Sequence, residues 1–407
     1  MVMETINLEA AKVDEAANAK LKDVSRGVQK ARKVVVVTGA GISCNAGIPD
    51  FRSEDGLYNL VKHQYPNAVM KGKDLFDTIL FSNPHSIAVF YTFMASLRSC
   101  IQRASPTETH RFIHFLKRRK KLLRCYTQNI DNLEAKVQTE LSCQLSLGVD
   151  PKRRPDVVQL HGDIDRLRCM QCSEEYEWFP EAETLCDSGD PPACPACVRC
   201  QEQRVEAGKR AIGVGSLRPS IVLYGEEHPH GDMIGRCTEL DLRAKPDCLI
   251  VMGTSLKVTG IRKLVRTMAK RVKENNGCVI LVNNTKLCVS AWKNVFDYHV
   301  EGDCDEWVHS LNDVGFFRIQ KTLPLSVKKQ QPSLNRKAKP ADEHTDQLTD
   351  AVAAKKASSM AKKLPSPPST PQKDPRQPLD DVTNRKRLLC DDQDKIAMKK
   401  LCVMKSP

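Results

Sequence analysis

The stretch Lys33-Val34-Val35-Val36-Val37-Thr38-Gly39-Ala40-Gly41-Ile42-Ser43 decides the fold of this chain. It begins with an uninterrupted β-branched run, which is typical of a parallel strand covered on both faces. The glycines after the run allow a close backbone approach to a pyrophosphate, and a following helix N-terminus supplies amide donors for it. The stretch therefore predicts the first strand of an α/β sheet and, as a hypothesis, dinucleotide binding. A tight turn that binds nothing is the alternative.

Short apolar runs and longer segments with helical spacing alternate beyond this strand. Further strands are expected at 122–126, 157–160, 221–224, 248–252 and 279–282, and helices at 83–104, 108–119 and 257–274. Leu21, Val24 and Val28 recur at helical spacing and predict an N-terminal helix. Repeated strand and helix predict an α/β fold with a doubly wound, parallel, Rossmann-like sheet. Its ligand should lie beyond the carboxyl ends of the strands.

Charge and composition separate the chain into a body and a tail. The net charge of the 407 residues is +13, and residues 321–407 contribute +9 of it, with 19 Lys and Arg against 10 Asp and Glu. The same segment holds 10 of the 23 prolines and none of the 21 aromatic residues. Too little apolar area is available there to offset the entropy of ordering, so a disordered basic tail is expected.

The cysteines predict a metal site rather than disulfides. Their number, 17, is odd, several stand in C-x-x-C pairs, and no secretory signal or membrane span is recognisable, so reduced thiols in cytosol or nucleus are expected. The pairs Cys169/Cys172 and Cys194/Cys197 are 21 residues apart, a spacing typical of a structural zinc site with four thiolates. Cys200 leaves open a second pair formed by Cys197 and Cys200.

Five segments follow from these patterns. We expect an N-terminal helix (1–30), a first part of the Rossmann-like domain (31–164, with a helical insertion at 59–120), a small inserted zinc-ribbon module (165–217), a second part of the Rossmann-like domain (218–320) and the disordered tail (321–407).

Three further motifs combine polar side chains at the expected strand ends. Pro49-Asp50-Phe51-Arg52 places a rigid turn, a carboxylate, an aromatic ring and a guanidinium together. Gln128-Asn129-Ile130-Asp131 offers carboxamides and a carboxylate to ribose hydroxyls, although an Asx turn that caps the next helix is an alternative. His161-Gly162 offers a general base, and a structural histidine is its alternative.

With these motifs in order, the chain resembles the sirtuin family of NAD-dependent protein deacylases from about residue 25 to 315. The strings that carry the resemblance are GAGIS, GIPDFRS, TQNID, HG, LRPSIVLYGE, MGTSLKV and LVNN. The strings HGD, LYGEEHPHG and FDYHVEGDCDEWV are most similar to the fungal nuclear branch that deacetylates core histones.

The resemblance implies NAD as cofactor and assigns roles to individual residues. His161 would be the catalytic base and Asn129 a second catalytic residue, and Cys194 is preferred over Cys200 because the family's second pair commonly reads C-P-x-C. The residues implied to bind NAD are Gly39, Ala40, Gly41, Ile42, Ala46, Gly47, Ile48, Pro49, Asp50, Phe51, Arg52, Tyr58, Gln128, Asn129, Ile130, Asp131, Gly253, Thr254, Ser255, Asn283 and Cys304. Those implied to pair with an acetylated peptide as an added strand are Val222, Leu223, Tyr224 and Gly225.

The implied reaction converts acetyl-lysine, NAD and water to lysine, nicotinamide and O-acetyl-ADP-ribose. Acetylated histone tails or core histone lysines would be the substrates, with consequences for chromatin silencing, transcription and genome stability. Protein ADP-ribosyl transfer or removal of longer acyl chains is the alternative within enzymes. A catalytically silent, NAD-sensing chromatin scaffold is the alternative from another class, and a zinc-ribbon nucleic-acid binder is disfavoured by the nearly neutral body.

Two basic segments concern partners and location. The 29 residues between Asp131 and His161 exceed the usual family spacing and include Pro151-Lys152-Arg153-Arg154-Pro155. That segment is either a contact to nucleosomal DNA or a solvated loop. In the tail, Arg385-Lys386-Arg387 and Lys399-Lys400 fit a bipartite nuclear import signal read by importin, and Ser366 and Thr370 precede prolines as phosphorylation candidates. Nuclear localisation is therefore expected.

Overall fold

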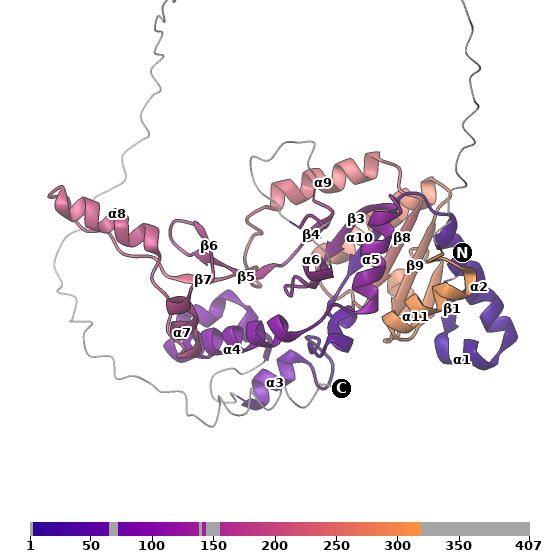
Figure 1. Ribbon diagram of the computed structural model, residues 1–407, viewed down its shortest axis with the longest axis horizontal. Coiled ribbons are helices and arrows are strands. Elements are labelled where there is room, and N and C mark those ends of the chain that lie inside the picture. Colours follow the sequence, from indigo (N-terminus) through magenta and orange to yellow (C-terminus); the bar gives the residue numbers. More distant parts are fainter. Residues whose placement is uncertain (1–2, 65–71, 138–140, 144–154, 319–407) are drawn as a thin grey trace, which may run out of the picture. The chain divides into compact units, whose positions relative to one another are not determined.

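The computed structural model describes residues 3–64, 72–137, 141–143 and 155–318, which belong to one compact unit (Figure 1). The expected tail and the basic segment 151–154 lie outside the described residues. Within the described part, no helix combines the length and the apolar character needed to cross a membrane.

A seven-stranded parallel sheet is the centre of this unit (Figure 1). Its strands, in spatial order, are β1 (Glu4–Asn7), β10 (Tyr298–Glu301), β9 (Cys278–Asn283), β8 (Cys248–Met252), β2 (Val34–Thr38), β3 (Leu122–Thr127) and β4 (Val157–Gln159). Every neighbouring pair is parallel. All five residues of β2 are buried, because helices cover both of its faces. The predicted Rossmann-like sheet is confirmed.

Alternate residues of the strands pack into two different apolar clusters. Val34 and Val36 face a cluster shared with α1 (Leu8–Val13), α2 (Glu15–Lys30), α5 (Glu108–Arg118) and α11 (Cys304–Ser310). Val35 and Val37 face the cluster of α10 (Thr259–Glu274), against which residues of α9 (Gly231–Arg243) also pack. The period of two along a strand thus divides the sheet between two helical layers. The same layers contain the short 3₁₀ helices η4 (Val289–Trp292) and η5 (Leu311–Val314).

A third apolar cluster lies beside the carboxyl ends of the strands and is mainly helical. It is built from α3 (Leu57–Gln64), η2 (Gly72–Phe76), η3 (Thr78–Ser82), α4 (Pro84–Arg103) and α6 (Leu133–Val137). A small antiparallel sheet, in the order β6 (Glu175–Glu177), β5 (Gly162–Cys169) and β7 (Leu217–Ile221), carries α7 (Pro180–Asp187) and α8 (Pro195–Glu206). This sheet begins before and ends after the expected module, 165–217.

Two predicted elements differ from the structure. Residues 1–30 do not form one helix: β1 precedes α1 and α2, because Asn7 and Asp14 accept hydrogen bonds from Ala10 and Ala16 and so begin two separate helices. The strand predicted at 221–224 is also wrong beyond its first residue. β7 ends at Ile221, since Glu226 accepts the amide of Leu223 and closes a turn there.

A buried ion pair connects the sheet to a covering helix. Arg124 of β3 donates from Nε and Nη2 to the two carboxylate oxygens of Asp241 in α9, at 2.6 and 2.9 Å. The Tyr126 hydroxyl donates to the same carboxylate at 2.7 Å, and Arg124 also donates to the carbonyl of Pro155. Both charged side chains are almost fully buried, at 3% and 1% exposure. Because little water reaches them, each charge is stabilised mainly by the other.

Replacing Asp241 with Asn should therefore destabilise the fold strongly. The substitution leaves the Arg124 guanidinium buried without a counter-charge, which typically costs about 3–5 kcal/mol. We expect the urea midpoint of unfolding to fall accordingly. Glu239→Gln removes an exposed partner of Arg243 from the same helix and should change the free energy of unfolding by less than about 1 kcal/mol. Equal effects of the two substitutions would contradict the role given to the buried pair.

Candidate active site

The predicted motifs meet at the carboxyl edge of the parallel sheet. The 3₁₀ helix η1 (Ala40–Ala46) follows β2, and the loop after β8 lies directly beside it. The Gly41 amide donates to the Gly253 carbonyl at 2.9 Å. A Cβ atom on Gly41 would lie 2.8 Å from Gly253 Cα, and Gly253 itself has a φ of +60°. Contact between two loops thus already requires these glycines, so a bound ligand is not needed to explain them.

Three polar side chains from the segments that follow β2 and β3 form a buried network. Ser43 Oγ donates to Asp131 Oδ2 at 2.7 Å, and Asn129 Nδ2 donates to Ser43 Oγ at 3.1 Å. Asn129 is only 3% exposed, and its Oδ1 has no hydrogen-bond partner among the described residues. Since a buried acceptor without a donor is costly, Asn129 Oδ1 fits a ligand that brings a hydroxyl or amide hydrogen. Ser43 is part of the GAGIS string, but its place in the network depends on a contact 88 residues away.

His161 lies at the same edge with a defined tautomer. Its Nδ1 is 2.9 Å from the Gln128 carbonyl oxygen, which can only accept, so Nδ1 carries the hydrogen and Nε2 keeps a free lone pair. Burial lowers the pKa of His161 below its ordinary 6.5, against the opposing effect of the Gln128 carbonyl, so the ring is neutral at pH 7. The Gln128 side chain is held in turn by donation to Thr38 O at 3.0 Å and Thr254 Oγ1 at 2.9 Å.

Two buried side chains that the motifs did not single out lie behind Asp131. His110, Asp131 and Glu134 bring ligand-type atoms within 4.8 Å of one another. Burial, and next the charge of Asp131, raise the pKa of Glu134 to about 8, so this carboxyl is largely protonated at pH 7. Sequence reasoning missed both His110 and Glu134, since each lies on an apolar helix face where a polar residue gives no motif.

The loop after η1 is stabilised largely by its own side chains. Asp50 Oδ1 accepts the amides of Arg52 and Ser53, each at 2.7 Å, which is an Asx turn. Phe51 packs edge-on against Tyr58, with ring centroids 5.7 Å apart, and Ile48 and Ile130 are buried in the same cluster. Asp50 therefore has a structural role that the sequence did not reveal.

Three residues predicted for the far end of the NAD site also lie close together. Asn283, at the end of β9, donates to Thr285 O at 3.0 Å, and the Cys304 thiol approaches Val282 O at 3.7 Å. The Gly253 amide donates to the same Val282 carbonyl at 3.0 Å. Burial raises the pKa of Cys304, so it is a neutral thiol. Gly253, Asn283 and Cys304, distant in sequence, thus meet at one end of the sheet.

The predicted peptide edge is partly occupied by the chain itself. The Tyr224 amide donates to Phe76 O at 2.7 Å, and Tyr224 O accepts from the Thr78 amide at 3.1 Å. Arg52 Nη2 also donates to the Tyr224 hydroxyl at 3.0 Å. Because backbone groups of successive residues point to opposite edges, a peptide could pair only with the edge of Leu223 and Gly225. On that edge the Leu223 amide already donates to Glu226 Oε2 at 3.0 Å.

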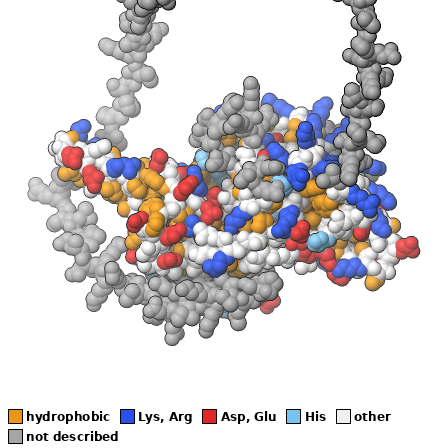
Figure 2. Space-filling view, in the orientation of Figure 1, with side chains coloured by type: hydrophobic (Ala, Val, Ile, Leu, Met, Phe, Trp, Pro, Cys, Tyr) orange, Lys and Arg blue, Asp and Glu red, His pale blue; other side chains and the backbone are white. Residues whose placement is uncertain are grey.

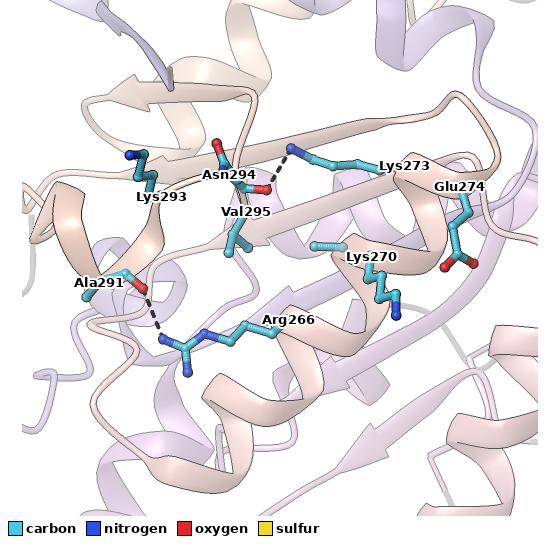
Figure 3. Close-up of a pocket in the computed structure, with 9 residues that line it drawn as sticks. Arg266, Lys270, Lys273, Glu274, Ala291, Lys293, Asn294 and Val295 are labelled. Carbon is cyan, nitrogen blue, oxygen red and sulfur yellow. Dashed lines mark hydrogen bonds between the residues drawn. The ribbon is translucent and has the colours of Figure 1, made fainter. Parts of the chain in front are cut away.

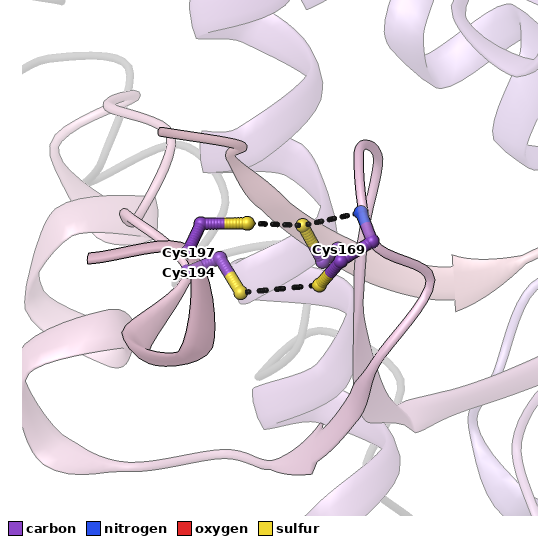
Figure 4. Close-up of side chains that lie close together, drawn as sticks. Cys169, Cys194 and Cys197 are labelled. Carbon is purple, nitrogen blue, oxygen red and sulfur yellow. Dashed lines mark hydrogen bonds between the residues drawn. The ribbon is translucent and has the colours of Figure 1, made fainter. Parts of the chain in front are cut away.

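Four cysteines of the small module fit a zinc ion (Figure 4). Cys169 and Cys197 have sulfurs 3.8 Å apart, those of Cys172 and Cys194 are 3.7 Å apart, and all four lie within 4.8 Å. A tetrahedron with Zn–S bonds of about 2.3 Å has edges of about 3.8 Å, which matches these separations. The Gln171 amide points at Cys169 Sγ, at 3.3 Å. Cys200 is exposed and outside the cluster, so the alternative pair of Cys197 and Cys200 is not the one assembled.

Loss of one ligand should release zinc and unfold the module. Cys172→Ser removes one of four thiolates, and binding free energy at such a site is also folding free energy. We expect purified Cys172→Ser protein to contain far less than one equivalent of zinc by atomic absorption and to be poorly soluble. Cys200→Ser is the matched control and should keep a full equivalent. A normal zinc content in the Cys172 variant would remove it from the ligand set.

The fold and the site together define a class: an α/β protein with a nucleotide-type site at the carboxyl edge of a parallel sheet and a separate four-thiolate module. Residues 39–260 match the model of the Sir2 family, and the chain belongs to that family. The predicted sirtuin resemblance is confirmed.

Known relatives support the same assignment. The chain is 49% identical over 299 residues to "NAD-dependent histone deacetylase HST3" of Candida albicans, covering 72% of this chain and 61% of that protein. It is 43% identical over 319 residues to the protein of the same name from Saccharomyces cerevisiae, covering 76% and 71%. The crystal structure of a Sir2 homologue in complex with NAD has the same fold, with a TM-score of 0.50 at 23% identity, and the match covers 72% of this chain and 94% of that one.

Proposed function

We propose that this chain is an NAD-dependent histone lysine deacetylase that produces lysine, nicotinamide and O-acetyl-ADP-ribose. One observation carries the proposal. A buried acceptor without a donor, Asn129 Oδ1, and an imidazole with a free Nε2, His161, lie at the same edge of the sheet. Family membership and the names of the two HST3 relatives support the same activity.

NAD would supply the ribose that accepts the acetyl group. The polar network then positions this ribose, because Asp131 holds Ser43, Ser43 orients the Asn129 amide, and the remaining Asn129 oxygen accepts a ribose hydroxyl. Since these hydrogen bonds fix the Asn129 side chain, little orientational freedom remains to be lost on binding. The glycines of the η1 loop, with Thr254, Asn283 and Cys304, would line the rest of the dinucleotide.

His161 would act as the general base through Nε2. Its Nδ1 hydrogen bond to Gln128 holds the ring plane, and burial keeps the ring neutral at pH 7, so the lone pair is available to take a ribose hydroxyl proton. The alternative of a purely structural histidine does not use this free nitrogen. Positioned bases contribute about 10²–10⁴-fold to rate.

The acetylated peptide would pair with the edge of Leu223 and Gly225, where it would replace Glu226 as the partner of the Leu223 backbone. Main-chain pairing recognises an extended backbone and little of its side chains. The Arg52–Tyr224 hydrogen bond joins the cofactor loop to this peptide segment. Binding of the two substrates would therefore order neighbouring parts of one site.

Chromatin would be the working environment. Histone names among the relatives motivate a nuclear location, and the tail would supply the import signal read by importin. Nucleosomal DNA contact through residues 151–155 is a further proposal of the same kind. The competing reactions, ADP-ribosyl transfer and removal of longer acyl groups, differ in the mass of the product, and a silent scaffold gives no product.

Replacing His161 with Tyr should nearly abolish turnover while dinucleotide affinity stays within a few-fold, because the change removes the base and not the network around Asn129. The test incubates purified protein with NAD and acetylated histone peptides and measures O-acetyl-ADP-ribose by mass spectrometry, with NAD affinity by calorimetry. His309→Tyr, on the exposed face of α11, is the control and should retain full turnover. Near-normal turnover in the His161 variant would exclude it as the base.

The dependence of kcat/KM on pH should follow the His161 ring. The pKa of His161 in the folded protein lies below 6.5, so the neutral base predominates above that value and is lost as pH falls through the folded pKa. We expect kcat/KM for an acetylated peptide at saturating NAD to be flat from about pH 6.5 to 8 and to decline below pH 6.5. A decline that begins above pH 7 would contradict a neutral, buried His161.

A further inference from the structure

The body has two strongly basic segments, residues 111–130, with seven Lys and Arg and no acidic residue, and residues 257–294. Residues 257–294 carry nine Lys and Arg and a single acidic residue, Glu274, a net charge of +8. The body up to residue 320 has a net charge of +4 in total, so its remaining residues sum to −4. Residues 257–294 are therefore far more basic than the average of the body, and in Figure 2 Lys and Arg side chains are frequent over the parallel-sheet part. A cluster of Lys and Arg of this kind on one face is the electrostatic footprint of a polyanion-binding surface.

Helix α10 arranges much of this charge in a row. Arg262, Arg266, Lys270 and Lys273 follow one another at intervals of four, four and three residues, which places them on one helix face. Apolar residues of the same helix, Val265 and Met268 among them, are buried against the sheet. At 1.5 Å per residue, the row is about 16 Å long, with neighbouring cations about 6 Å apart.

A groove of about 660 Å³ lies beside this row, between α10 and the loop after η4 (Figure 3). Arg266 crosses it to donate to Ala291 O at 3.0 Å, and its guanidinium lies 4.9 Å from the Trp292 ring centroid. Lys273 donates to Asn294 O at 3.0 Å and pairs with Asp297 at 2.8 Å. These contacts hold the two walls of the groove together.

Two lysines of the groove carry positive charges that no neighbouring acidic group among the described residues compensates. Lys270 and Lys293 are exposed, and the described part of the chain provides neither with a hydrogen bond or an ion pair. Glu274, the acidic residue of the segment, already pairs with Arg271 at 3.0 Å. Lys270 and Lys293 therefore offer free ammonium groups on opposite walls.

We propose that the α10 row and this groove bind the phosphate backbone of duplex DNA. The groove lies between the end of α10, which leads into β9, and the loop that leads into β10, so it is at the amino ends of these strands. The candidate active site is at their carboxyl ends. DNA is favoured over an acidic peptide because the cations repeat along a line at near-constant spacing, as the charges of a nucleic-acid backbone do. On chromatin, which rests on the proposed function, this DNA binding would hold the enzyme on the nucleosome while the active site at the opposite edge of the sheet deacetylates its substrate.

The experiment compares two double variants of the full chain. Lys270→Gln/Lys293→Gln removes the free groove lysines, and Lys209→Gln/Arg210→Gln removes the same charge from an exposed segment after α8. Binding to a 20-bp duplex is measured by fluorescence anisotropy across salt concentrations, with polyglutamate as a second ligand. Each lost phosphate contact lowers the slope of log K against log salt by about 0.9, so the groove variant should lose about 1.8 and the control nothing. The tail contributes equally to all proteins.

Equal slopes in the groove variant and the wild type, or equal losses in both variants, would overturn the proposal. A groove variant that loses polyglutamate binding but keeps its DNA slope would assign the surface to an acidic protein instead. Deacetylation of a free histone peptide should be unchanged in both variants, and circular dichroism should show an intact fold. Absence of deacetylation in the wild type would refute the proposed function and leave the DNA result standing.

Discussion

The site depends on the close approach of two loops at the carboxyl edge of a parallel sheet. The loop after β2 reaches the loop after β8 through the hydrogen bond from Gly41 to Gly253, and a side chain at either position would separate them. This contact holds η1, and η1 holds Ser43 against Asp131. The orientation of Asn129 follows from Ser43. The close approach of the two loops thus fixes, through these hydrogen bonds, the position of the buried Asn129 oxygen that fits a ligand.

Burial has different consequences in different parts of the molecule. It lowers the pKa of His161 and raises the pKa of Glu134 to about 8, so the imidazole is neutral and this carboxyl largely protonated at pH 7. Arg124 and Asp241 instead form a direct ion pair in the buried layer between sheet and helix. The four cysteines form a third arrangement, in which a metal would reinforce a module whose own apolar core is small. Chemistry, stability and local folding are thus supported by separate sets of polar residues.

Sequence reasoning succeeded where a pattern is local. The uninterrupted apolar runs predicted β2 and β8 to the residue or nearly so, because a strand buried on both faces needs such a run. The cysteine spacing predicted the sulfur cluster for a similar reason, since two short turns supply both pairs. It failed for residues 222–224, which have strand-like composition but turn because of Glu226. It also missed β1 and β10, which lie at and next to the edge of the sheet and have only a weak apolar pattern.

The sequence by itself determined the parallel α/β sheet, the family and the identity of the polar residues at the strand ends, because these depend on spacing along the chain. The tertiary structure decided which of those residues touch. It brings Ser43 to Asp131, 88 residues away in sequence, and Tyr224 to Phe76 and Thr78. It also shows that the Asp50 carboxylate stabilises the turn in which it lies. The choice of Cys194 over Cys200 was likewise decided in space. Contacts between distant segments depend on how loops pack at one edge of the sheet, and no periodicity in a single chain records that packing.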